Sequence, residues 1–97
     1  MNRSDLLKKL EEFKKVSGEK YGIESIGVFG SFARNQDSVC SDADIVIKTK
    51  VPDPFAIVHI KEELEGVLRI PVDIVRFREK MNPFLKRRIK KEAIYVR

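Results

Sequence analysis

The sequence has few of the residue types that form cross-links or bind transition metals. Its 97 residues include one cysteine and one histidine, and tryptophan is absent. A single cysteine cannot form an internal disulfide bond, so we expect a reducing, cytoplasmic setting. The lone cysteine therefore argues against a disulfide-stabilised secreted protein.

Long apolar runs are also missing. None approaches the ~20 residues needed to span a bilayer, and the first residues, MNRSDLLKKLEE, lack the apolar core of a signal peptide. We therefore expect no membrane partner. Apolar residues still make up 42% of the chain, which is enough for a globular fold. The length allows one domain, residues 1–97.

Charge is distributed unevenly along the chain. The formal net charge of +5 combines +2 in residues 1–23, −4 in residues 24–75 and +7 in residues 76–97. Alone, a net charge of +5 suggests only an anionic partner. We expect the acidic middle and the basic tail to have separate roles, the tail being either a solvated helix face or a docking surface.

Hydrophobic periodicity predicts an α/β domain with a sheet of three to four strands packed with helices. A helix over residues 4–18 is expected, with Ser4 as its cap and Gly18 at its end. Two further helices should begin at Asp53-Pro54 and Asn82-Pro83, since each pair is a cap followed by proline. Strands are expected at residues 23–30, 42–49 and 72–77, with a short fourth strand near residue 94. The phenylalanines should lie in the core, with Phe32 as a candidate to flank a nucleotide.

Three carboxylates lie within predicted strands, where aspartate is disfavoured. Asp42 and Asp44 are two residues apart and point to the same side of an extended strand, and Asp73 lies in the apolar segment VDIV. Such a cluster is understandable if a cation neutralises it, and oxygen ligands suit Mg²⁺ or Mn²⁺. Three carboxylates can hold two ions ~4 Å apart. The alternative is that Asp42 is a turn residue and Asp73 an edge position.

Gly30 and Ser31 follow the first predicted strand. A glycine at a strand end, followed by serine at the start of a helical turn, offers N–H groups and a hydroxyl to a phosphate. The pair alone is common in ordinary turns. Its position, with ten residues between Ser31 and Asp42, makes it informative, because phosphate donors and metal ligands would meet.

The segments GSFARN, SDADIVI and VDIV together resemble the signature of the DNA polymerase β-like nucleotidyltransferase superfamily. The short chain and its ending, NPFLKRRIKKEAIYV, are most similar to the minimal nucleotidyltransferases, the antitoxins that accompany HEPN-domain toxins. The resemblance implies the nucleotidyltransferase fold, with a small mixed sheet. One departure is Asn35, where members of the family often carry glycine. Asparagine tolerates the same left-handed backbone, so the change is minor.

The resemblance also implies a role for each site residue. Gly30 and Ser31 would hold the β- and γ-phosphates of ATP or another nucleoside triphosphate, with Arg34 contacting phosphate or pairing with a carboxylate. The catalytic and metal-binding residues would be Asp42, Asp44 and Asp73. Asp73 would also orient or deprotonate the attacking hydroxyl.

The function implied is metal-dependent transfer of AMP from ATP to a hydroxyl, the acceptor being a tyrosine of a partner HEPN toxin. Two alternatives from other classes stay open. One is an antitoxin that neutralises its toxin by binding alone. The other is a nucleic-acid-binding module that uses the basic C-terminal helix, whose binding would depend steeply on salt.

Overall fold

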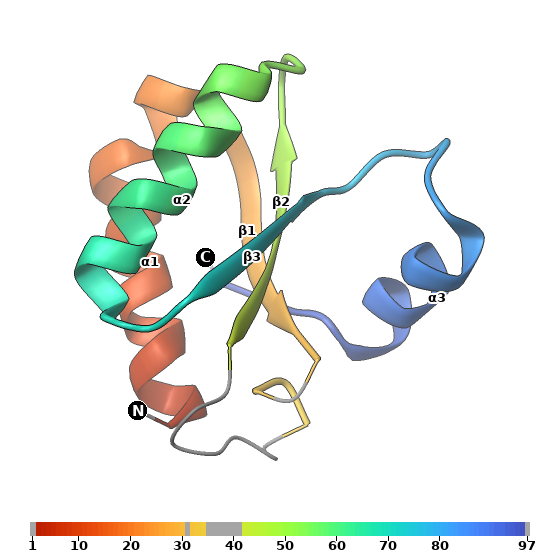
Figure 1. The fold of residues 1–97 in the computed structure, drawn as a ribbon, viewed down its shortest axis with the longest axis horizontal. Helices are drawn as coiled ribbons and strands as arrows, with labels where there is room; N and C mark the ends of the chain where they lie inside the picture. Colours follow the sequence, from red (N-terminus) through yellow and green to blue (C-terminus); the bar gives the residue numbers. More distant parts are fainter. Residues whose placement is uncertain (1, 31, 35–41, 97) are drawn as a thin grey trace.

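The computed structural model describes residues 2–30, 32–34 and 42–96 (Figure 1). Its elements, in chain order, are α1 (Arg3–Tyr21), β1 (Ile23–Phe29), β2 (Ala43–Thr49), α2 (Pro54–Leu68), β3 (Val72–Arg76), α3 (Pro83–Glu92) and β4 (Ile94–Tyr95). The predicted order of helices and strands is confirmed, including the short last strand.

The four strands form one mixed sheet in the order β3-β2-β1-β4. β1 pairs antiparallel with β2 and with β4, whereas β2 and β3 run parallel and are joined through α2. The continuous apolar stretch from Ile45 to Ile47 predicts a central strand, and β2 is central, with all three residues fully buried. The predicted α/β class with a mixed sheet is therefore confirmed.

The helices cover the two faces of the sheet unequally. α1 and α2 lie together on one face, and the shorter α3 lies on the other (Figure 1). The larger core lies between the sheet and the helix pair, where Leu6, Leu10 and Leu64 are fully buried. A smaller cluster under α3 contains Phe29, Val46 and Ile89, together with the partly buried Val75.

Side chains two residues apart on a strand share a face, so Asp44 lies on the α3 face with Val46, and Asp73 lies there with Val75. Two of the three predicted carboxylates, Asp44 and Asp73, are thus on the less covered side of the sheet.

The helix ends follow local capping chemistry. Asp53 and Asn82 accept N–H bonds from the first turns of α2 and α3, as predicted. The predicted ends of α1 are wrong: Asn2 caps its start by accepting from the Asp5 N–H, and the helix continues through Gly18 to a left-handed Gly22. Gly22 supplies the positive φ, 64°, that ends the helix.

The predicted core position of two phenylalanines is also wrong. Phe55 and Phe84 each follow the first proline of a helix and are 76% and 77% exposed. Phe32 is 2% exposed and packs in the core, so its ring has no surface to offer a nucleotide. Within the described residues, no helix has both the length and the apolar composition that crossing a bilayer requires.

Candidate active site

Two of the three predicted carboxylates lie side by side on neighbouring strands. In the parallel ladder, Asp44 of β2 is paired with Asp73 of β3. Asp42 directly precedes β2 and is exposed. In the part of the chain that the structure describes, no three His, Cys, Asp or Glu side chains are already placed together as a set of metal ligands, so the structure does not assemble all three predicted carboxylates as one ligand set. The fold therefore brings Asp44 and Asp73 together, with Asp42 next to them at the start of β2.

The electrostatics of the site centre on Asp44. Burial raises the pKa of the Asp44 carboxyl, and the negative charges of Asp73 and Asp42 raise it further, while Arg88 and Arg34 lower it. The pKa rises overall, so the nearby arginines do not fully compensate the carboxylates. A divalent cation would relieve this repulsion, and the all-oxygen donors fit Mg²⁺ or Mn²⁺.

Gly30 directly follows β1 and lies against the Asp44 carboxylate. Its backbone has a φ of +74°, which residues with a side chain rarely adopt. A methyl group at this position would overlap the Asp44 carboxylate. The Arg34 N–H donates to the Gly30 carbonyl at 3.1 Å, which is the spacing of one helical turn. Gly30 is therefore favoured by its backbone conformation, and a side chain there would displace the Asp44 carboxylate. Ser31, the other half of the predicted phosphate corner, lies outside the described residues.

Glu92, at the end of α3, joins this turn to the C-terminal helix. Its carboxylate accepts from the Gly30 N–H at 3.2 Å and from Arg34 Nη1 at 2.9 and 3.0 Å. Arg88 Nε lies 3.6 Å from the same group. Burial alone would raise the pKa of Glu92, but Arg34, the Gly30 N–H and Arg88 together lower it. Glu92 thus holds in place the Gly30 N–H and the Arg34 guanidinium, two groups predicted from the sequence to bind phosphate.

Two residues of the basic tail lie at the site, so the acidic middle and the tail are not separate in space, while the role of the tail as a docking surface or a solvated face stays a prediction. α3 folds back over β1, which places Arg88 close enough to lower the pKa of Asp44 and places Glu92 on Gly30. Neither Arg88 nor Glu92 is among the site residues predicted from the sequence. The available signal was that Glu92 is one of only two acidic residues in residues 76–97. An isolated acid in a basic segment often has a specific cationic partner.

The arrangement is suited to chemistry on a phosphate ester. It combines a carboxylate pair that favours cations, a glycine turn that admits close approach, and two arginines within the same region. These features lie at the ends of three adjacent strands, where Asp44 is paired with Phe29 on one side and with Asp73 on the other.

The fold and site define a nucleotidyltransferase. The sequence profile described as a nucleotidyltransferase domain matches residues 10–96, and this chain belongs to that family. The resemblance noted in its motifs is therefore confirmed.

The relatives belong to a narrower group. A Methanocaldococcus jannaschii protein with the provisional name protein adenylyltransferase MJ0128 is 38% identical over 88 residues, covering 90% of each chain. The protein adenylyltransferase MntA of Thermococcus cleftensis is 31% identical over 88 residues, covering 90% of this chain and 88% of its own.

Solved structures share the fold. One, provisionally described as a minimal nucleotidyltransferase, superposes with a TM-score of 0.80 at 28% identity and covers 97% of this chain and 95% of its own. A toxin–antitoxin structure with AMP-PNP gives a TM-score of 0.76 at 19% identity, covering 92% of this chain and 70% of its own. At that identity the second match supports the fold alone.

Proposed function

We propose that this protein transfers AMP from ATP to a tyrosine hydroxyl of a HEPN-domain toxin and so acts as its antitoxin. The observation that carries the proposal is the Asp44–Asp73 pair beside the Gly30 turn. It is supported by relatives named protein adenylyltransferases. The same fold occurs in an MNT antitoxin solved with a tri-AMPylated Shewanella oneidensis HEPN toxin, with a TM-score of 0.58 at 17% identity, a likeness that bears on the fold alone.

The chain's own residues divide the work of binding. Asp42, Asp44 and Asp73 would hold two Mg²⁺ ions, or Mn²⁺ in their place. These ions would neutralise charge on the triphosphate and on the leaving group. Gly30, the hydroxyl of Ser31 and the guanidinium of Arg34 would position the β- and γ-phosphates. For this the phosphate would replace Glu92 as the acceptor of the Gly30 N–H and of Arg34 Nη1. Catalysis then consists of positioning and charge neutralisation rather than a covalent intermediate.

The reaction is a single displacement at the α-phosphorus of ATP. The acceptor oxygen bonds to that phosphorus, the bond to the bridging oxygen breaks, and pyrophosphate leaves with the electron pair. Asp73 orients the acceptor hydroxyl and accepts its proton as the new bond forms. Asp73 is exposed on β3, an edge strand of the sheet, so an acceptor from another protein can reach it.

Transfer and simple binding can be separated by one paired experiment. The protein is incubated with ATP labelled in the α-phosphate, Mg²⁺ and the candidate toxin, and the toxin's activity is measured in parallel. We expect label on the toxin, loss of label with EDTA, and at least ~100-fold less label with Asp42→Asn or Asp44→Asn.

Those variants should also lose most of their neutralising effect. If they neutralise the toxin as fully as the wild type does, the protein acts by binding and the catalytic account of its antitoxin role is wrong. If the wild type binds RNA at ~0.2 M salt and labels no protein, the nucleic-acid alternative is favoured instead.

A further inference from the structure

β3, which carries Asp73, is an edge strand of the sheet. Its pairing with β2 defines which of its own backbone groups face outward. The Ala43 N–H donates to the Pro71 carbonyl at 3.0 Å. The Phe77 N–H donates to the Ile47 carbonyl at 2.8 Å. Alternate residues of a strand turn their N–H and C=O groups toward the same neighbour. Residues 73 and 75 therefore also face β2, and residues 72, 74 and 76 face away from it.

One of these outward groups confirms the assignment. The N–H of Val72 donates to Glu65 of α2 at 3.0 Å, away from β2. The next two outward N–H groups, those of Ile74 and Arg76, have no hydrogen-bond partner among the residues that the structure describes. Unpaired groups at a strand edge are a template for another strand.

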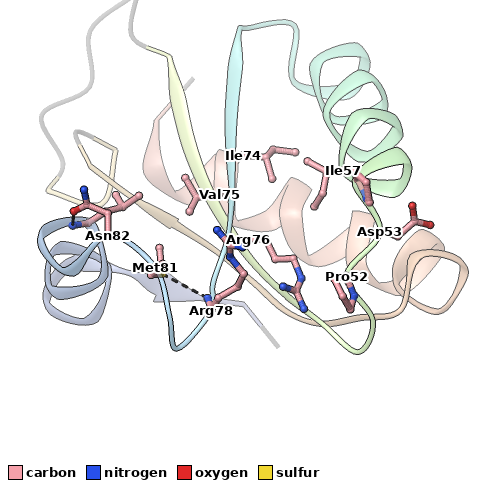
Figure 2. A pocket seen from close by; sticks show the side chains of 11 residues that line it. Pro52, Asp53, Ile57, Ile74, Val75, Arg76, Arg78, Met81 and Asn82 are labelled. Atoms are coloured by element: carbon pink, nitrogen blue, oxygen red, sulfur yellow. Dashed lines mark hydrogen bonds between the residues drawn. The ribbon is translucent and has the colours of Figure 1, made fainter.

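Two grooves run along this edge. Their volumes are about 450 and 670 Å³, and both are lined by Ile57, Ile74 and Val75. The first lies between the starts of α2 and α3, with β3 crossing its middle (Figure 2). The second continues toward Asp73. The grooves therefore form one path that leads to the proposed catalytic carboxylate.

The two ends of the path differ in charge. At the Asp73 end the lining residues include Glu62 and Glu65 but only one cation, Lys61. At the other end the charged lining residues are Arg76, Arg78 and Asp53. Arg76 is held by a 2.7 Å bond from its Nε to Thr49 Oγ1, and Arg78 is exposed. An acidic group on a ligand would be favoured at the arginine end.

We propose that the β3 edge binds an extended segment of the acceptor protein as an added strand, with its tyrosine at Asp73 and an acidic side chain at Arg78. This inference rests on the proposed AMP transfer and names how the acceptor is held. A strand advances ~3.3 Å per residue, so the acidic residue lies about three to five positions from the modified tyrosine. The other edge strand, β4, is a poorer site for an added strand. It is only two residues long, and two strands separate it from β3, which carries Asp73.

Two matched pairs of variants test this edge. Ile74→Pro removes the outward N–H without touching the ladder to β2, and Ile74→Ala trims the side chain but keeps that N–H. Arg78→Glu reverses a groove charge, and Lys80→Glu makes the same charge change outside the residues that line the grooves. KM values for the acceptor and for ATP are measured with the labelling assay above.

The expected result is a KM for the acceptor about tenfold higher in Ile74→Pro than in Ile74→Ala, and about tenfold higher in Arg78→Glu than in Lys80→Glu. The KM for ATP should be unchanged in all four. Replacing the acidic residue near the labelled tyrosine by lysine should weaken the wild type and restore Arg78→Glu. Should Ile74→Pro not fold, the Arg78 pair and this charge swap decide the question.

Equal acceptor KM values within each folded pair would overturn the inference, as would a labelled tyrosine with no acidic residue at that spacing. So would a dimer of this chain that Ile74→Pro abolishes, because the edge would then be a self-association surface. If the wild type labels no acceptor at all, the proposed function itself fails, which is a different result.

Discussion

At the scale of single residues, Gly30 combines a backbone requirement with a chemical one. Its φ of +74° places it in the left-handed region, and the Asp44 carboxylate occupies the space where a side chain would begin. We expect Gly30→Ala to lower the free energy of unfolding by about 1–2 kcal/mol from the backbone alone. It should also reduce AMP transfer, because Asp44 must move. Chemical denaturation and the labelling assay measure the two effects.

The matched control is Gly66→Ala on α2. Gly66 is exposed and helical, and a methyl group there meets nothing within 4 Å. Alanine is the better helix former, so this variant should gain up to about 1 kcal/mol and keep full activity. If the two substitutions had equal effects, the steric role assigned to Gly30 would be wrong.

Asp44 gives a residue-scale prediction about pH. Its pKa is raised on folding, so ionising it destabilises the folded state as pH rises through its unfolded and then its folded pKa. Without added metal, Asp44→Asn should therefore be more stable than the wild type at pH 7. The difference should vanish below about pH 3, where the aspartate is protonated in both states. Urea denaturation at the two pH values measures it, with the exposed Glu24→Gln as the control. A variant less stable than the wild type at pH 7 would contradict the account.

The role of a residue could be predicted from the sequence only where its neighbours along the chain indicate it. Asp44 and Asp73 were recognisable because aspartate is unusual inside apolar strands, and the structure pairs them. Glu92 was not, because its partner Gly30 is 62 residues away and only the folding of α3 over β1 brings them together.

At the scale of elements, α1 and α2 are joined by a polar cluster around Glu63. Its carboxylate accepts from Tyr21 Oη at 2.6 Å, from Ser17 Oγ at 3.3 Å and from Lys20 Nζ at 3.3 Å. The hydrogen bond from Tyr21 is the main cause that lowers the pKa of Glu63. A lowered pKa means that this stabilisation is present above the unfolded pKa and is lost as pH falls through the folded one.

We therefore expect Glu63→Gln to cost about 0.5–1.5 kcal/mol at pH 7, the range of one hydrogen bond. The cost should shrink as pH falls below about 4, because protonation makes the wild-type carboxyl neutral, as the glutamine amide already is. Denaturation curves at both pH values measure it. Since the cluster is on the helix-covered face, AMP transfer should be unaffected. A loss of transfer in the folded variant would show that the two faces are coupled.

Element ends could be predicted where a cap and a proline coincide, as at Asp53-Pro54 and Asn82-Pro83. The ends of α1 could not, since both Ser4 and Asn2 are good caps and both Gly18 and Gly22 are present. Only the backbone of the folded chain selects between them. Phe55 and Phe84 show a different limit. The starts of their helices were predicted, but which side of the first turn packs against the rest of the protein is set by the tertiary fold.

At the scale of the whole molecule, alternating apolar segments predicted the class of fold, but not the order of strands. The order β3-β2-β1-β4 places β1 and β2, both from the acidic middle of the chain, at the centre of the sheet and returns the basic tail against them. The net charge of +5 hides this arrangement. The proposed acceptor path follows from the same topology, since β3 carries Asp73 and has an open edge.

The central claim is that the Asp44–Asp73 pair transfers AMP to a partner protein. The most direct measurement is the intact mass of a purified HEPN toxin after incubation with ATP, Mg²⁺ and this protein, followed by mapping of the modified residue. We predict the added mass of one or more AMP units on tyrosine with the wild type, and none with Asp73→Asn. An unmodified toxin with the wild type, or equal modification by folded Asp73→Asn, would contradict the account.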